Sequence, residues 1–156
     1  MRSVVIVGQG PGAYMCGIYL HTANMSPLII KACKEKPDFS GSGNVVGVKG
    51  IQRPEEFIDL VERQSRNMGI NVVEEEVVEI ARREGCLEVK TDASVYKTKS
   101  LVIDSKALET RYRPLLEDNG VFYVSDKAPC KEAIVLAGAG CKVSFDVKEF
   151  MDTMKQ

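Results

Sequence analysis

The sequence lacks the broad features that would assign it to nucleic acid or to a membrane. Its 21 basic and 22 acidic residues leave a net charge of -1, which predicts no electrostatic affinity for nucleic acid or anionic lipid. No segment approaches the ~20 apolar residues of a membrane span, and Met1-Arg2 leads straight into a short apolar run rather than a signal segment. We therefore expect a cytoplasmic protein without a membrane partner.

Residues with metal or redox chemistry are few and scattered. His21, the single histidine, has no cysteine, aspartate or second histidine at metal spacing and lacks the context of a Ser-His triad. The cysteines are odd in number and none forms a Cys-x-x-Cys pair, so we expect reduced packing or surface thiols. They are Cys16, Cys33, Cys86, Cys130 and Cys141. The sequence predicts no metal site and no catalytic residue.

The N-terminus carries the most informative motif in the chain. Residues 3–7 (Ser-Val-Val-Ile-Val) are followed at 8–13 by Gly-Gln-Gly-Pro-Gly-Ala, the order of a strand, a glycine turn and a helix. Gly8 permits a tight turn, Gly10 allows close approach of a pyrophosphate, and the small Ala13 lets the helix lie near the strand. The N–H groups of such a helix end attract phosphate. The predicted cofactor-binding residues here are Gly8, Gly10, Pro11, Gly12 and Ala13.

Hydrophobic periodicity divides the first half of the chain into alternating strands and helices. A largely buried helix is expected over 12–24 and a short strand over 27–30, and a right-handed crossover between the two strands makes them parallel. Residues 33–50 are predicted to be a loop across one edge of the sheet, and a helix is expected from Pro54 to Gly69.

The second half changes period and then returns to the first pattern. Strands are expected over 70–73, 77–80, 86–91 and 94–97, forming a small antiparallel sheet. Apolar strands over 101–104 and 120–124 flank a charged connector, and a long helix is predicted from about 130. Gly138 and Gly140 interrupt that helix, so we expect a packing or ligand-approach reason for them.

With both ends in view, the chain resembles the flavin-binding half of low-molecular-weight thioredoxin reductases. Residues 4–13 resemble the family's flavin fingerprint, 57–69 its next helix, 120–126 its late Gly-Val-Phe-Ala-Ala-Gly-Asp motif, and 133–141 its closing helix. The resemblance implies an α/β, Rossmann-like FAD-binding fold in three layers, with a central parallel sheet and a small antiparallel sheet. We expect one domain over 1–156, in which 1–107 and 120–156 match the two halves of the family's flavin domain.

The resemblance breaks between those halves. The family inserts an NADPH-binding domain with a second glycine motif and a redox Cys-x-x-Cys pair, whereas here 108–119 takes its place. Without a nicotinamide site no hydride reaches a flavin, and without paired cysteines no dithiol passes electrons onward. Stand-alone thioredoxin reductase activity is not expected.

Residues on the adenosine side also depart from the family. Lys31 stands where related chains often have an acidic residue for the ribose, and a lysine cannot accept hydrogen bonds from the ribose hydroxyls. Glu35 is the nearest acidic substitute, either as a ribose ligand or as a solvated loop charge. The family's Ala-Thr-Gly turn is replaced by residues 104–106, Asp-Ser-Lys, which removes a glycine that lets backbone approach the cofactor.

On the flavin side the sequence retains one of the family's acidic residues and adds another. Asp126 matches the acid that bonds the ribitol, although a capping or turn carboxylate is an equal interpretation. Ser125 replaces a glycine, and the Arg-Gln-Ala that follows in the family is here Lys131-Glu132-Ala133. The resemblance places Ala133 at the cofactor and Glu132 beside the flavin, where its charge would oppose that of a reduced ring.

These observations leave three hypotheses open. One is a flavoprotein that still binds FAD and acts in thiol redox with a redox protein partner supplying NADPH and dithiol functions. Another is a cofactor-free pseudo-reductase, kept as an interaction module or homodimer. The third is a glycine turn that binds another adenine nucleotide. We weigh the cofactor-free hypothesis slightly above the FAD-binding one.

Overall fold

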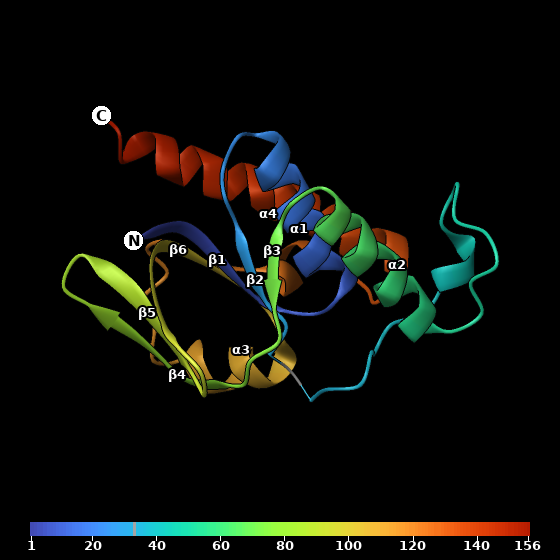
Figure 1. Cartoon of the computed structure of the whole chain (residues 1–156), viewed down its shortest axis with the longest axis horizontal. Helices are drawn as coiled ribbons and strands as arrows, with labels where there is room; N and C mark the ends of the chain where they lie inside the picture. Colours follow the sequence, from blue (N-terminus) through green and yellow to red (C-terminus); the bar gives the residue numbers. More distant parts are fainter. Residues whose placement is uncertain (33) are drawn as a thin grey trace.

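A seven-stranded sheet organises the chain, and the computed structural model describes it for residues 1–32 and 34–156 (Figure 1). The strands follow the order β3-β2-β1-β6-β5-β4, and β7 also pairs with β6. Their bounds are β1 (Arg2–Gly8), β2 (Leu28–Ile30), β3 (Asn71–Val73), β4 (Val77–Arg83), β5 (Cys86–Thr91), β6 (Val95–Asp104) and β7 (Val121–Tyr123).

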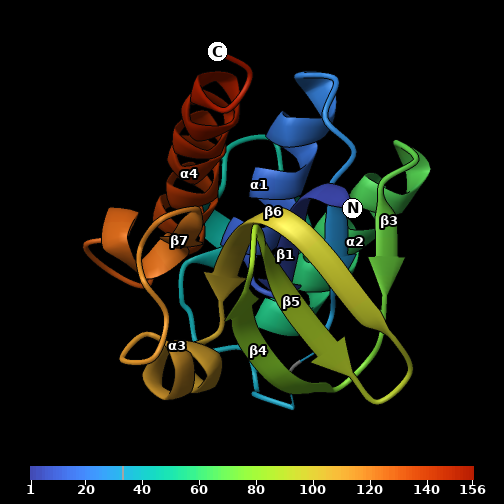
Figure 2. The same ribbon diagram turned by 90° about the vertical axis from the view of Figure 1, so that its left-hand side faces the viewer.

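The helices lie on the two sides of this sheet, which gives the molecule three layers (Figures 1 and 2). Helices α1 (Pro11–Thr22), α2 (Pro54–Asn67) and α4 (Ala133–Thr153) share one hydrophobic core with the sheet. The short α3 (Lys106–Tyr112) belongs to the core on the opposite face. Two 3-10 turns, η1 (Ser42–Asn44) and η2 (Val124–Lys127), complete the elements. The predicted α/β class and Rossmann-like layering are confirmed.

The parallel part of the sheet grows outward from β1. Val5 pairs with Leu28 of β2, and Leu28 in turn pairs with Asn71 of β3, all in parallel. The assignment of 70–73 to the antiparallel sheet was therefore wrong. Helix α2 carries the chain back across the sheet, so β3 can only join β2 in the same direction.

The antiparallel part is continuous with the parallel part through β6. Residues 94–97 and 101–104 were expected to be separate strands, but β6 runs unbroken through the polar residues between them. Buried Thr98 and Ser100 donate side-chain hydrogen bonds to backbone carbonyls, which satisfies their hydroxyls inside the sheet. The first part of β6 pairs antiparallel with β5 and the second part parallel with β1 and β7. The antiparallel strands share the second core with β1.

Helices α1 and α4 cross at a pair of glycines. A Cβ built on Gly140 would collide with the carbonyl oxygen of Gly12, so only a glycine permits this approach. This confirms a packing reason for Gly140. Gly138, by contrast, has open space at its Cβ position.

The predicted connector and the predicted loop both contain short helical elements. Helix α3 occupies the start of the connector, where Ser105 caps it by accepting a hydrogen bond from Leu108 N–H. The loop that follows β2 contains η1. Among the described residues, no helix is both long and apolar enough to cross a membrane.

Candidate functional site

The glycine turn joins β1 to α1 at the carboxyl end of the central strands. Gly8 has φ = +143°, and a Cβ there would collide with the Asp104 carbonyl of the neighbouring strand. Gly10 is the N-cap of α1, and Pro11 occupies its first turn. The sequence thus folds locally as predicted, with a strand, a glycine turn and a helix end directed at the edge where dinucleotides bind in this architecture.

The side chain of Asp104 already occupies this helix end. Its Oδ2 accepts a hydrogen bond of 2.8 Å from the Ala13 N–H, in the first turn of α1. The same oxygen would lie 2.7 Å from a Cβ on Gly10 and 3.3 Å from one on Gly12. The glycines therefore make room for a carboxylate of the chain itself. A helix N-terminus favours any anion, and here the anion is Asp104.

The surroundings of Asp104 disfavour the charged form of its carboxyl group. Burial raises the pKa of its carboxyl from 3.8 to about 6, the hydrogen bond from Ala13 acts in the opposite direction, and the carboxylates of Glu35 and Glu109 raise it further. The helix end thus stabilises a carboxylate that its other neighbours destabilise.

Lys31, directly after β2, belongs to a polar cluster centred on Glu62 of α2. The Glu62 carboxylate lies 2.8 Å from Lys31 Nζ and accepts hydrogen bonds from Tyr14 Oη and Arg66 Nε. Burial acts to raise the pKa of Glu62, but its bonds to Lys31 and Arg66 outweigh burial and lower it. The position where related chains often have an acidic residue therefore carries a lysine paired within the chain.

Glu35 lies on the other side of the glycine turn, against α3. Its Oε1 accepts a 2.6 Å hydrogen bond from the Ala107 N–H and one of 3.3 Å from Ser105 Oγ. Its backbone carbonyl accepts a hydrogen bond from Gln9 Nε2. Glu35 thus caps the first turn of α3 and links it to the glycine turn.

Asp126, in η2, pairs with the connector. Both of its carboxylate oxygens accept from Arg113, at 2.8 and 2.9 Å. Arg113 also bonds Glu109, lies over the ring of Tyr123, and has its pKa raised by the Asp126 and Glu109 carboxylates. Ser125 donates to Glu109. The acid that the resemblance assigns to the ribitol is held in a bidentate ion pair.

Ala133 begins α4 and is fully buried. Its N–H donates a 2.8 Å hydrogen bond to the Ser40 carbonyl, and Ser40 Oγ donates to Glu132. The loop after β2 therefore reaches the start of α4. The structure thus brings Ala13, Glu35, Asp126 and Ala133 to one edge of the sheet, but each is engaged by another part of the chain.

The sequence located the predicted site residues but did not reveal which other residues of the chain bind them. Asp104 was noted only for the glycine that its segment lacks, although a carboxylate at the end of a central strand could have suggested a cap for the first helix. Nothing in the sequence pointed to Arg113 as the partner of Asp126, because that pair depends on how the connector folds.

The described cysteines are free thiols, and the described histidine, cysteine and acidic side chains form no metal-binding cluster. Cys16 and Cys86 are buried and Cys130 is exposed, each as a free thiol. Burial raises the pKa of Cys16, which suits an inert packing thiol. Cys33 lies outside the described residues.

At this edge a carboxylate of the chain competes with any dinucleotide for the start of α1. A pyrophosphate needs the N–H groups at the start of α1, and Asp104 has taken that of Ala13. One cavity, of about 350 Å³, lies at this edge between Lys31 and α2, and another, of about 570 Å³, lies away from it between β7 and the end of α4.

Comparison with known proteins identifies the fold through structures alone. No family model and no curated protein matches the sequence. Among solved structures, thioredoxin reductase from Lactococcus lactis aligns with a TM-score of 0.54 at 22% identity, over 66% of this chain and 35% of that one. The atypical thioredoxin reductase from Desulfovibrio vulgaris Hildenborough aligns with a TM-score of 0.57 at 18% identity, over 66% and 35%.

A ferredoxin-flavin thioredoxin reductase from Clostridium acetobutylicum is similar to the same extent, with a TM-score of 0.53 at 21% identity over 65% of this chain and 36% of that one. The chain matches only about a third of the length of each of these reductases. Over about two thirds of its own length, it has the Rossmann-like fold of a thioredoxin reductase.

Proposed function

We propose that this chain is a cofactor-free, thioredoxin-reductase-like module that acts by binding another protein, a second copy of itself included, and not by transferring electrons. The observation that carries the proposal is the Asp104 carboxylate on the Ala13 N–H. It supports a glycine turn whose anion site is filled from within the chain.

The size of the electrostatic repulsion between Asp104 and a phosphate supports this interpretation. A phosphate oxygen about 4 Å from an ionised Asp104 would be repelled by about 4 kcal/mol at an effective dielectric constant of about 20. A penalty of that size weakens binding by roughly a thousandfold. The contribution of the glycine turn to pyrophosphate binding would then be largely cancelled.

The outer surfaces of α1 and α4 offer hydrophobic area to a protein partner. Tyr19 and Phe145 are 41% and 58% exposed and contact each other edge to face, with ring centroids 6.1 Å apart. Ile134, also on α4, is 51% exposed. Aromatic side chains of this kind are enriched in protein interfaces. Light scattering of the purified chain tests the homodimer directly.

An FAD titration tests the absence of cofactor. We expect colourless protein after purification and no shift in the visible flavin bands when FAD is added in excess. Asp104→Ala removes the competing carboxylate and leaves the Ala13 N–H available, so this variant should bind FAD measurably. Asp59→Ala, which removes an exposed carboxylate on α2, is the matched control and should behave as the unaltered chain does.

A second function remains as the alternative, supported by the intact turn at Gly8 and the helix end that follows it. It is an FAD-binding flavoprotein that acts in thiol redox with a partner supplying NADPH and dithiol functions. Yellow protein with a shifted, protein-bound flavin spectrum would establish it and refute the cofactor-free proposal.

A further inference from the structure

Three helices begin at the carboxyl edge of the sheet, and the first turn of each is met by an acceptor from elsewhere in the chain. Two of the three acceptors come from the segment after β2, which we call the strap and define as residues 34–41. The contacts are Asp104 Oδ2 with Ala13 N–H of α1, Glu35 Oε1 with Ala107 N–H of α3, and the Ser40 carbonyl with Ala133 N–H of α4.

One end of the strap is fixed to the glycine turn and to α3. Gln9 Nε2 donates to the Glu35 carbonyl at 3.2 Å, and the Glu35 carboxylate bonds Ala107 and Ser105. The hydrogen bond from the Ala107 N–H is short, at 2.6 Å, as expected for a charged acceptor. This end of the strap thus lies beside the starts of α1 and α3.

The other end of the strap is fixed to the start of α4. Asp38 forms an ion pair with Lys131, and Ser40 N–H donates to the Lys131 carbonyl at 2.9 Å. Ser40 Oγ donates to Glu132, which approaches so closely to Gly41 that a Cβ there would collide with its carboxylate. Gly41 has φ = +70°, which favours glycine at this contact.

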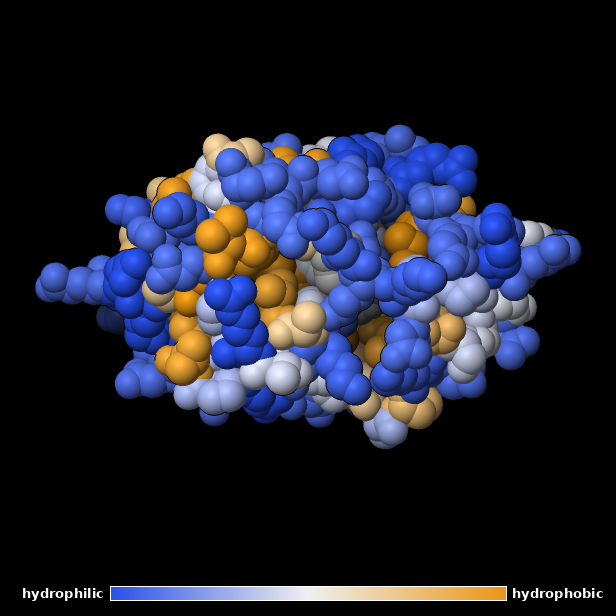
Figure 3. All heavy atoms as spheres, turned by 90° about the horizontal axis from the view of Figure 1, so that it is seen from below, coloured by the Kyte–Doolittle hydropathy of each residue, from blue (hydrophilic) through white to orange (hydrophobic). Residues whose placement is uncertain are grey.

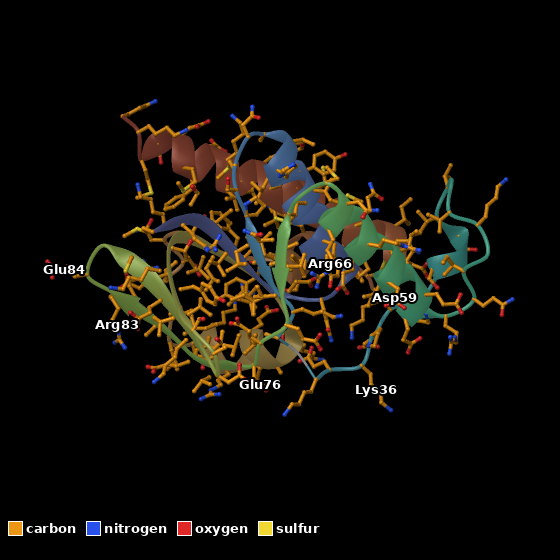
Figure 4. The ribbon with its side chains drawn as sticks, in the orientation of Figure 1. Lys36, Asp59, Arg66, Glu76, Arg83 and Glu84 are labelled. Carbon is orange, nitrogen blue, oxygen red and sulfur yellow. The ribbon has the colours of Figure 1, made fainter. Side chains whose placement is uncertain are left out.

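The strap therefore runs along the edge from the glycine turn to α4, with its polar contacts directed inward. Lys36, between the two fixed ends, points away from the body of the protein (Figure 4). Viewed from below, hydrophobic atoms gather toward the side that carries β4, β5 and α3, and polar atoms predominate toward η1 (Figure 3). In open α/β sheets the crevice outside the carboxyl ends of the strands is where ligands bind.

We propose that residues 34–41 form an autoinhibitory strap, which holds this crevice closed to dinucleotides by supplying its own acceptors to the starts of α3 and α4. The inference rests on the proposed function, since it explains how the flavin-side part of the edge stays closed where Asp104 does not reach. The strap closes one part of the edge and Asp104 the other. Opening the edge fully requires changes at both.

The test uses FAD as the probe and Asp104→Ala as the background. Adding Glu35→Ala and Asp38→Ala removes the carboxylate acceptors from both fixed ends of the strap, and both positions are exposed. We expect the triple variant to bind FAD at least tenfold more tightly than Asp104→Ala alone. Lys36→Gln in the same background is the control and should leave the Kd unchanged.

Amide hydrogen exchange provides a readout that needs no ligand. The Glu35→Ala and Asp38→Ala pair should speed exchange at Ala107 and Ala133 by at least tenfold and leave Ala13 unchanged. An unchanged Kd, an absence of FAD binding in the triple variant, or unchanged exchange at both amides would each overturn the strap. FAD binding by the unaltered chain would refute the proposed function instead, and the strap would then be judged by whether its two substitutions tighten that binding.

Discussion

Asp104→Asn isolates the energetic cost of placing a carboxylate at the start of α1. The amide has nearly the same size, and its oxygen can still accept from the Ala13 N–H, so the cap is retained without the charge. Burial and two neighbouring carboxylates raise the pKa of Asp104 in the folded protein to about 6, whereas its ordinary value is 3.8. The folded chain therefore holds this proton more tightly than the unfolded chain does.

The sign and size of the effect follow from that difference. The stabilisation from the extra proton is complete below pH 3.8 and is lost as the pH rises through 6. A difference of 2.2 between these values corresponds to about 3 kcal/mol at 1.36 kcal/mol for each unit. Because Asp104 is only partly buried, solvent screening lowers this figure, and we expect about 1 to 3 kcal/mol.

Urea unfolding at several pH values between 4 and 8 measures the effect. Relative to the unaltered chain, Asp104→Asn should gain about 1 to 3 kcal/mol in unfolding free energy on going from pH 4 to pH 8. Carboxylates whose pKa is lowered by ion pairs, such as Asp38 and Glu62, titrate in both proteins and cancel in the comparison. Asp59→Asn, an exposed carboxylate on α2, is the control (Figure 4). Parallel pH profiles for Asp104→Asn and the unaltered chain would refute the reasoning.

Two further substitutions, each with a control, test the crossing of α1 and α4 and the charged cluster around Glu62. Gly140→Ala places a methyl group against the Gly12 carbonyl and should lower the unfolding free energy by about 1 to 3 kcal/mol in the same urea titration. Gly138→Ala meets open space and should leave the unfolding free energy unchanged or raise it by up to ~1 kcal/mol. Equal effects of the two would contradict the close helix crossing. Glu62→Gln leaves Lys31 without its charged partner and should cost about 1 to 3 kcal/mol, against almost no change for exposed Glu55→Gln; similar values for both would show that the Glu62 cluster contributes little.

The alternation of strands and helices could be predicted because it depends on short-range patterns. Residues 3–13 combine an apolar strand, glycines that a tight turn requires, and Pro11 in the first helical turn, and the structure follows them closely. The same reasoning failed for 70–73, where four residues of largely apolar character cannot reveal whether the partner strand is parallel or antiparallel. That choice was made by helix α2 and its direction across the sheet.

The candidate site was predictable only as a set of positions. The glycine turn and Asp126 do lie at the carboxyl edge with Glu35 and Ala133. Whether these groups face a ligand depends on contacts between residues far apart in the chain. Asp104 is 91 positions from Ala13, so no local pattern could show that the carboxylate meets this N–H.

The sequence by itself determined that β1 leads through a glycine turn into α1, since φ at Gly8 and the space at Gly10 depend on residues that lack a Cβ. It also determined the alternation of strands and helices, through the periods of its apolar residues. Only the tertiary structure decided what the turn contacts. Each helix start at this edge needs an acceptor, and the folded chain supplies Asp104 from the end of β6 and Glu35 and Ser40 from the strap.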